Sequence, residues 1–347
     1  MNRRLAVLPL VLACLLAACG GAEPEPTPEV ATVGVVIDSG SSGDRSFNQY
    51  TLEGARNAAE AAGLRLFFNE PQSATDYEAT IERVVADGAD LVIASGFRMG
   101  DATSKAAQRH PDVTFAIVDT AYFPGAGCAE DVADCYTEEG GLSNVTSLMF
   151  AEDEIGYLAG VLAACMTDTG TIASVAGVEI PPVVRFVTGY QNGARFVRPD
   201  VTTLNRYVPD FNDPDTGKVV GQDFILQGAD VLFGVGGNTG NGGLLAAHEA
   251  GLMAIGVDMD QYFTYPEVAP TLLTSASKNV DVAAALAVES FASGTLEPGL
   301  HMANLENGGI GLAPYHDWED RIPQECKDLV ISAEEAILAD PAVTGAK

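Results

Sequence analysis

Four ionisable side chains follow apolar runs at positions suited to ligand binding. Three aspartates and one lysine each come shortly after a run of mainly aliphatic residues: Asp38, Asp119, Asp258 and Lys278. In open α/β sheets ligands bind beyond the carboxyl ends of the strands. If the runs are parallel strands, three carboxylates and one amine converge at such an edge. Each Asp alone is equally suited to capping a helix or forming a turn, so the group of four carries the prediction.

Two phenylalanines stand in polar loops, where no strand or helix face would bury them. Phe47 opens a helical pattern directly after Asp44-Arg45-Ser46, and Phe211 lies in the turn-rich stretch from Pro209 to Pro214. One from each half of the chain could hold a flat ring between them, with each stacking contact worth about 1 to 3 kcal/mol. Packing beneath the loop is the alternative for both. Phe186 is a competing candidate, although its helical spacing is also typical of a core residue.

A glycine-rich segment, Gly234 to Gly240, superficially resembles a phosphate-binding loop. It lacks the Lys of that motif, and as a dinucleotide-binding motif it is weak without a first βα unit and an acidic residue about twenty positions on. We interpret the glycines around Gly236 as allowing the backbone to approach a ligand closely. The cysteines form no CxxC pair and the histidines no ligand spacing, so no metal or other cofactor is expected. The histidines are His110, His248, His301 and His316.

Short apolar runs alternate with amphipathic stretches of about ten to fifteen residues, the pattern of parallel βαβ units. We predict strands at 32–37, 64–68, 91–94, 113–118, 171–176, 203–208, 231–234, 253–257 and 272–274. We predict helices at 47–62, 76–87, 103–109, 151–166, 183–197, 218–227, 244–250 and 280–293.

The pattern occurs twice, which indicates two α/β lobes. A helix end followed by Gly-Ala-Asp and an apolar run appears at Gly88 and again at Gly228, each glycine being suited to ending a helix. We predict two doubly wound parallel-sheet lobes that face each other across a cleft. The predicted lobes comprise 31–145 with 278–303, and 146–277 with 304–347. The three crossings between them are expected near 144–150, 275–278 and 303–305.

The N-terminus has the features of an export signal. Two arginines precede the apolar run from Leu5 to Ala17, which is too short to span a bilayer. Leu16-Ala17-Ala18-Cys19-Gly20 resembles the lipobox of bacterial lipoproteins, in which cleavage precedes a lipidated cysteine; ordinary signal cleavage is the alternative. We therefore expect a signal peptide at 1–18, lipidation of Cys19 and a Pro- and Glu-rich tether at 19–30. The mature protein would be anchored on the extracytoplasmic face of the cell membrane.

Four cysteines remain after Cys14 and Cys19, in a compartment that favours disulfides. Cys128 and Cys135 bracket a short acidic loop, and a bridge between them would stabilise the fold by about 2 to 3 kcal/mol. We predict that disulfide. Cys165 and Cys326 could form a second bridge or remain two buried thiols.

Composition excludes several classes of protein. The chain has 18 Lys and Arg against 48 Asp and Glu, a formal net charge of −30, and its basic residues are scattered singly. Nucleic-acid binding needs clustered cations, so we expect no nucleic-acid partner. With 47% hydrophobic residues the chain can bury enough apolar surface to fold.

Five further motifs stand at specific separations: Val35 to Asp38 (VVID), Gly43 to Gln49 (GDRSFNQ), Tyr157 to Gly160 (YLAG), Gly256 to Gln261 (GVDMDQ) and Thr274 to Lys278 (TSASK). Together they resemble the basic membrane protein family, lipoproteins that serve ABC transporters as substrate-binding subunits. The likeness extends from about Thr32 to the C-terminal helix. The best-understood members resemble purine nucleoside receptors.

The resemblance implies a role for each candidate residue. Phe47 and Phe211 would stack on the base, Asn48 would hydrogen-bond its edge, and Asp258 would accept bonds from the ribose hydroxyls. Charged hydrogen bonds of this kind are about twice as strong as neutral ones. Asp38, Asp119, Gly236 and Lys278 would complete the ligand-binding set. The region from Val178 to Pro182 and the cysteine-bracketed loop depart from the family pattern.

The family implies a binding protein without catalytic activity that delivers a nucleoside, expected to be a purine nucleoside, to a permease. Three alternatives remain open. A flat heterocycle bearing a polyol, such as riboflavin, would satisfy the same groups. A nucleoside-processing enzyme could use carboxylates near a ribose, although no Ser/His/Asp grouping or metal-binding aspartate cluster is present. A ligand-sensing regulator of the same fold would need a DNA-reading module, which the chain lacks.

Overall fold

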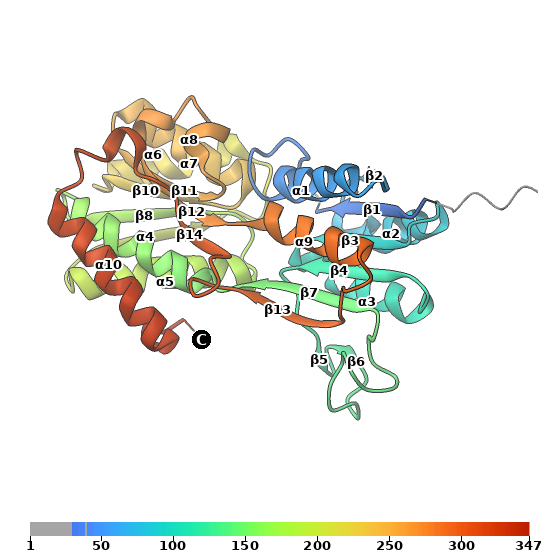
Figure 1. The fold of residues 1–347 in the computed structure, drawn as a ribbon. Helices are drawn as coiled ribbons and strands as arrows, with labels where there is room; N and C mark the ends of the chain where they lie inside the picture. Colours follow the sequence, from blue (N-terminus) through green and yellow to red (C-terminus); the bar gives the residue numbers. More distant parts are fainter. Residues whose placement is uncertain (1–29, 39, 347) are drawn as a thin grey trace, which may run out of the picture. The chain divides into compact units, whose positions relative to one another are not determined.

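The computed structural model describes residues 30–38 and 40–346. The predicted signal peptide, Cys19 and most of the tether lie outside the described residues. From Ala31 onward the chain forms one compact unit. Within it lie two six-stranded sheets, which define a first and a second lobe, and one two-stranded ribbon (Figure 1).

The first sheet is parallel throughout, in the order β13-β7-β4-β3-β1-β2. Its strands are β1 (Thr32–Ile37), β2 (Arg65–Asn69), β3 (Leu91–Ser95), β4 (Thr114–Val118), β7 (Val145–Phe150) and β13 (Gly299–Ala303). Its helices are α1 (Phe47–Ala61), α2 (Tyr77–Ala86), α3 (Gly100–Arg109) and α9 (Val280–Ala292). Alternate residues of β1 face opposite cores: Val35 joins the core that contains α1 and α9, and Val36 joins the one under α2 and α3. Both faces of the sheet are therefore covered.

The second sheet has the order β14-β12-β11-β10-β8-β9, and only the β12–β14 pair is antiparallel. Its strands are β8 (Thr171–Ala176), β9 (Thr202–Tyr207), β10 (Val231–Val235), β11 (Met253–Asp258), β12 (Leu272–Lys278) and β14 (Ile310–Leu312). Its helices are α4 (Glu152–Met166), α5 (Pro181–Val197), α6 (Pro214–Leu226), α7 (Gly237–Ala250), α8 (Gln261–Thr264) and α10 (Gln324–Ala339). Short 3₁₀ helices occupy Ala74–Asp76, Phe97–Met99, Ala269–Thr271, His316–Trp318 and Pro341–Thr344. Figure 1 shows α6 and α7 on one side of this sheet and α4, α5 and α10 on the other.

Helices α4 and α5 pack at very short range because glycines face each other. A Cβ at Gly160 would lie 2.0 Å from the carbonyl oxygen of Tyr190, and one at Gly193 would lie 2.0 Å from that of Tyr157. A Cβ at Gly156 or Gly189 would lie 2.4 Å or 2.3 Å from a carbonyl oxygen of the opposite helix. The spacing of four residues places each pair of glycines on one helix face.

The first crossing between the sheets comes later in the chain than the sequence predicts. Strand β7 pairs with β4 and β13, so residues 145–150 belong to the first sheet, and the chain crosses between Phe150 and Glu152. Residues 146–150 were therefore wrongly assigned to the second lobe. The second crossing follows β12, and the third lies between β13 and β14. The second and third crossings lie close to the predicted places.

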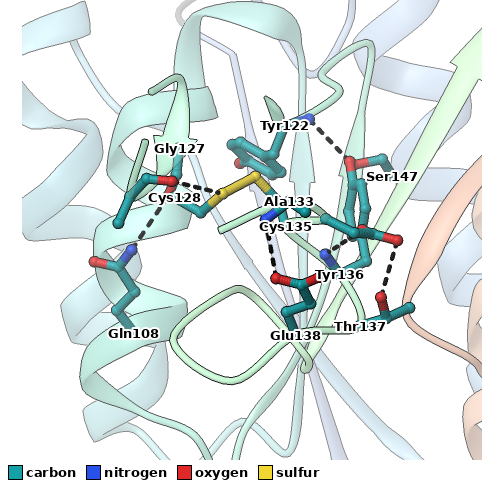
Figure 2. The surroundings of a disulfide bond; sticks show 12 residues. Gln108, Tyr122, Gly127, Cys128, Ala133, Cys135, Tyr136, Thr137, Glu138 and Ser147 are labelled. Carbon is teal, nitrogen blue, oxygen red and sulfur yellow. Dashed lines mark hydrogen bonds between the residues drawn. A yellow bond between two sulfur atoms is a disulfide. The ribbon is translucent and has the colours of Figure 1, made fainter. Parts of the chain in front are cut away.

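Two disulfides brace the fold. The expected bridge joins Cys128 to Cys135 beside the short ribbon of β5 (Phe123–Pro124) and β6 (Gly127–Cys128). Figure 2 shows Tyr136 next to this bridge, where its hydroxyl accepts a 2.9 Å bond from the Tyr122 amide and lies 2.7 Å from Ser147 Oγ. The pairing that the sequence left open is also present, because Cys165 of α4 is bonded to Cys326 of α10. Among the described residues, no helix has the length and apolar character needed to cross a membrane.

Candidate ligand-binding site

A cavity lies where the carboxyl ends of the two sheets face each other. All eight side chains or backbone positions expected to contact a ligand line it: Asp38, Phe47, Asn48, Asp119, Phe211, Gly236, Asp258 and Lys278. Asp44, Ile180, Pro182, Val183 and Phe186 line it as well. Both lobes therefore contribute polar and apolar groups to one site.

The position of Phe47 and Asn48 is set by the start of α1. The Asp44 carboxylate accepts hydrogen bonds from the amides of Ser46, Asn48 and Gln49 at 2.9 to 3.1 Å. These bonds satisfy N–H groups at the start of the helix that have no partner within it. Burial, with a smaller contribution from the nearby charge of Asp258, raises the pKa of Asp44 to about 6, even though these three bonds lower it. The Asn48 side-chain oxygen accepts a 3.2 Å bond from the Asp38 amide, so loop and strand end are joined.

The Asp38 carboxylate is engaged by residues of its own lobe. Arg98 donates to it from Nη2 at 2.7 Å and from Nε at 3.1 Å, and the Tyr77 hydroxyl donates to it as well. The Arg98 guanidinium in turn lies 5.2 Å from the centre of the Phe211 ring in the second lobe. Asp38 therefore orients an arginine that reaches across the cleft. If Asp38 also contacts a ligand, as expected, it does so while bonded to Arg98 and Tyr77.

A buried charge network surrounds Lys278, the last residue of β12, next to the second crossing. Its ammonium lies 2.6 Å from Asp119 and 2.8 Å from Glu152, whose other oxygen accepts a 2.7 Å bond from Arg185. Burial alone would lower the pKa of Lys278, but the charges of Asp119, Glu152 and Asp258 raise it above its ordinary value. Burial raises the pKa of Asp119 to about 6 despite the neighbouring ammonium. The ammonium also lies 5.1 Å from the centre of the Phe47 ring.

Two of the strand-end aspartates have unusual backbone angles. Asp119 has φ of 69° and Asp258 has φ of 64°, a region that residues with a side chain rarely adopt. Such conformations cluster at functional sites. The Asp258 carboxylate accepts a 2.5 Å hydrogen bond from Ser46 Oγ of the first lobe, and burial raises its pKa above the ordinary value.

Gly236 is tightly packed, but its neighbours belong to the protein. A Cβ there would lie 2.7 Å from the Gly177 amide nitrogen and 3.2 Å from the Phe211 ring, and φ at Gly236 is 122°. The glycines thus let the Phe211 ring lie against the strand ends. Phe186 is both a cavity residue and a core residue. It lines the cavity, and its ring packs edge-on against Phe233 with 6.1 Å between the ring centres.

Sequence reasoning did not single out Arg98, Glu152 or Arg185. Arg98 contacts an aspartate 60 positions earlier, and Glu152 contacts a lysine 126 positions later. No local spacing connects such partners. The described residues hold no group of three or more His, Cys, Asp or Glu side chains arranged for a metal ion.

Two parallel-sheet lobes, three crossings and a cavity between the carboxyl ends of both sheets are the features of the type I periplasmic-binding-protein fold. The family model described as "ABC transporter substrate-binding protein PnrA-like" (Bmp) matches residues 31–339, so the chain belongs to this family.

Relatives and solved structures agree with that assignment. The chain is 31% identical to a Lactococcus lactis protein named ABC transporter nucleoside-binding protein BmpA, over 88% of this chain and 86% of that protein. It is 30% identical to an uncharacterized lipoprotein of Pyrococcus horikoshii, over 88% and 76%. An ABC transporter solute-binding protein from Aeropyrum pernix superposes with a TM-score of 0.79 at 28% identity, covering 89% of this chain and 91% of that one.

Proposed function

We propose that this protein binds a nucleoside, of the purine class, between its lobes and delivers it to the permease of an ABC importer. The observation that carries the proposal is the pairing of a ring-stacking residue with buried carboxylates in one cavity: Phe47 from the first lobe, and Asp258 and Asp119 at the strand ends. The name of the Lactococcus relative supports the same ligand class.

The chemistry of the cavity suits an uncharged, hydroxyl-bearing ligand. Phe47 offers a face for a heterocycle, and carboxylates accept bonds from vicinal hydroxyls. Five buried carboxylates lie at or next to the cavity, Asp38, Asp44, Asp119, Glu152 and Asp258, against the three cations of Arg98, Lys278 and Arg185. This excess of acidic groups disfavours a phosphorylated ligand, because a buried negative charge would lack a partner.

Calorimetry with inosine and its free base hypoxanthine tests this function. We expect wild-type protein to bind inosine, and Asp258→Asn to weaken inosine at least tenfold while changing hypoxanthine affinity less than twofold. Asp223→Asn, which alters an exposed carboxylate on α6, is the matched control. Absence of inosine binding by the wild type would contradict the nucleoside proposal, and release of hypoxanthine from inosine would indicate an enzyme instead.

We also propose that Cys19 carries the lipid that anchors the protein to the membrane. The support is the sequence around Cys19 together with relatives that are named lipoproteins. Cys19→Ser is expected to move the protein out of the membrane fraction or to leave the signal uncleaved, as judged by fractionation and gel mobility. A variant that fractionates and migrates like wild type would refute the anchor.

A further inference from the structure

The two lobes also meet at the loop that precedes α1. Asn241 of α7 donates a 3.0 Å hydrogen bond from Nδ2 to the Asp44 carbonyl oxygen, and both residues are buried. At the rim, Thr264 of α8 donates a 3.0 Å bond from Oγ1 to the Arg45 carbonyl oxygen. Arg45 also stacks over the Tyr265 ring at 4.7 Å. Consecutive residues of one loop are thus held by the second lobe.

The orientation of the Asn241 amide is fixed by a relay that starts at a backbone amide. The Val257 N–H can only donate, and it donates to Gln261 Oε1 at 2.9 Å. Gln261 must therefore present its NH₂ group to Asn241 Oδ1, at 2.8 Å. That bond in turn directs the NH₂ group of Asn241 to the Asp44 carbonyl.

The relay is rigid because Gln261 is fully buried and held at a second point. Its own backbone amide donates to Ser275 Oγ at 3.0 Å. The relay therefore connects β11, α8 and α7 of the second lobe before it reaches the first lobe. The Asn241 side chain is therefore already oriented for its bond to the first lobe.

The far end of the relay lies on the loop that positions the ligand-binding side chains. The Asp44 side chain caps the helix that begins at Phe47 and continues with Asn48, while its carbonyl accepts the bond from Asn241. Asn241 itself is not among the described residues that line the cavity. Its contact therefore acts on the approach of the lobes and on the loop, without touching the ligand.

We propose that Asn241 is a positioning residue that latches the two lobes and thereby sets how long a bound ligand stays. This inference rests on the proposed function, because it takes the cavity as the ligand site. A ligand in a closed cleft leaves only after the lobes separate, so loss of a contact made across the lobes speeds release. Association begins in the open form, where the Asn241–Asp44 bond is broken, and is expected to be little affected.

Stopped-flow measurement with inosine tests the latch. Asn241→Ala is expected to release inosine about five to ten times faster, with an association rate within twofold of wild type. Asn192→Ala is the matched control, because Asn192 Nδ2 makes a 2.8 Å bond to the Thr344 carbonyl inside the second lobe. We expect this control to release inosine at the wild-type rate. Unchanged release from a folded Asn241→Ala protein would overturn the proposal.

A second variant keeps the test valid if Asn241→Ala does not fold. Asn241→Asp keeps the size of the side chain but removes the NH₂ group that donates to the Asp44 carbonyl, and it is expected to release inosine about five to ten times faster; a wild-type rate would then overturn the proposal. If wild-type protein does not bind inosine, the proposed nucleoside function fails separately. Small-angle scattering without ligand then decides about the latch, since Asn241→Ala should have a larger radius of gyration than wild type and Asn192→Ala. Equal radii would overturn it.

Discussion

The carboxylates around the cavity differ in what surrounds them. Asp38 is bound by an arginine, Asp119 by a lysine, and Asp44 by backbone amides alone. Their positions at strand ends and at a helix start could be predicted from sequence, because those places follow from apolar runs and their ends. Their partners could not be predicted, since Arg98 reaches Asp38 only after the sheet has formed.

The raised pKa of Asp44 has a consequence for stability. Its pKa rises from 3.8 to about 6 in the folded protein, so the folded state holds the proton more tightly than the unfolded chain. The resulting stabilisation is complete below about pH 4 and is lost as pH rises through about 6. Relative to Asp44→Asn, wild type should therefore lose about 3 kcal/mol of unfolding free energy between pH 4 and pH 7.

Denaturant titrations of both proteins at several pH values measure this difference. Asp101→Asn, at an exposed position on α3, is the control for the substitution itself. If the difference between wild type and Asp44→Asn stayed constant from pH 4 to pH 7, Asp44 would not titrate in that range.

Most elements could be predicted because each has a local signal. Strands β1 and β8 have the predicted bounds. Helices α4, α5 and α9 begin and end within two residues of their predicted bounds. Strands β5, β6, β7, β13 and β14 are not among the predicted strands. The prediction has crossings at 144–150, where β7 lies, and at 303–305, where β13 ends. Three of the five residues of β13 are exposed, as suits an edge strand, so it lacks the apolar run that marks a buried one.

The close contact between α4 and α5 gives a prediction about stability. Gly160→Ala would place a methyl group 2.0 Å from a backbone oxygen, so the helices must separate. We expect the unfolding free energy to fall by about 1 to 3 kcal/mol, the usual cost of overpacking. Gly311→Ala is the control, since a Cβ there meets nothing within 4 Å. Equal stability of the two variants in urea titrations would contradict this packing.

At the scale of the whole molecule, contacts between the lobes occur at several separate places. Arg98 meets Phe211, Ser46 meets Asp258, and Asn241 meets the loop before α1. Under the proposed function, these contacts would have to break when the lobes separate to admit or release a ligand. The three crossings near Glu152, Lys278 and Ala303 are where the backbone can bend. The charge network of Lys278 lies at two of them.

A ligand can favour the closed arrangement only through its greater affinity for that state. Residues of both lobes line the cavity, so a ligand can make the complete set of contacts only after closure. Small-angle scattering with and without inosine tests this claim most directly. We predict a smaller radius of gyration when inosine is bound. An identical scattering curve at saturation, with binding confirmed by calorimetry, would show that the lobes do not move and would contradict the transport mechanism proposed for this protein.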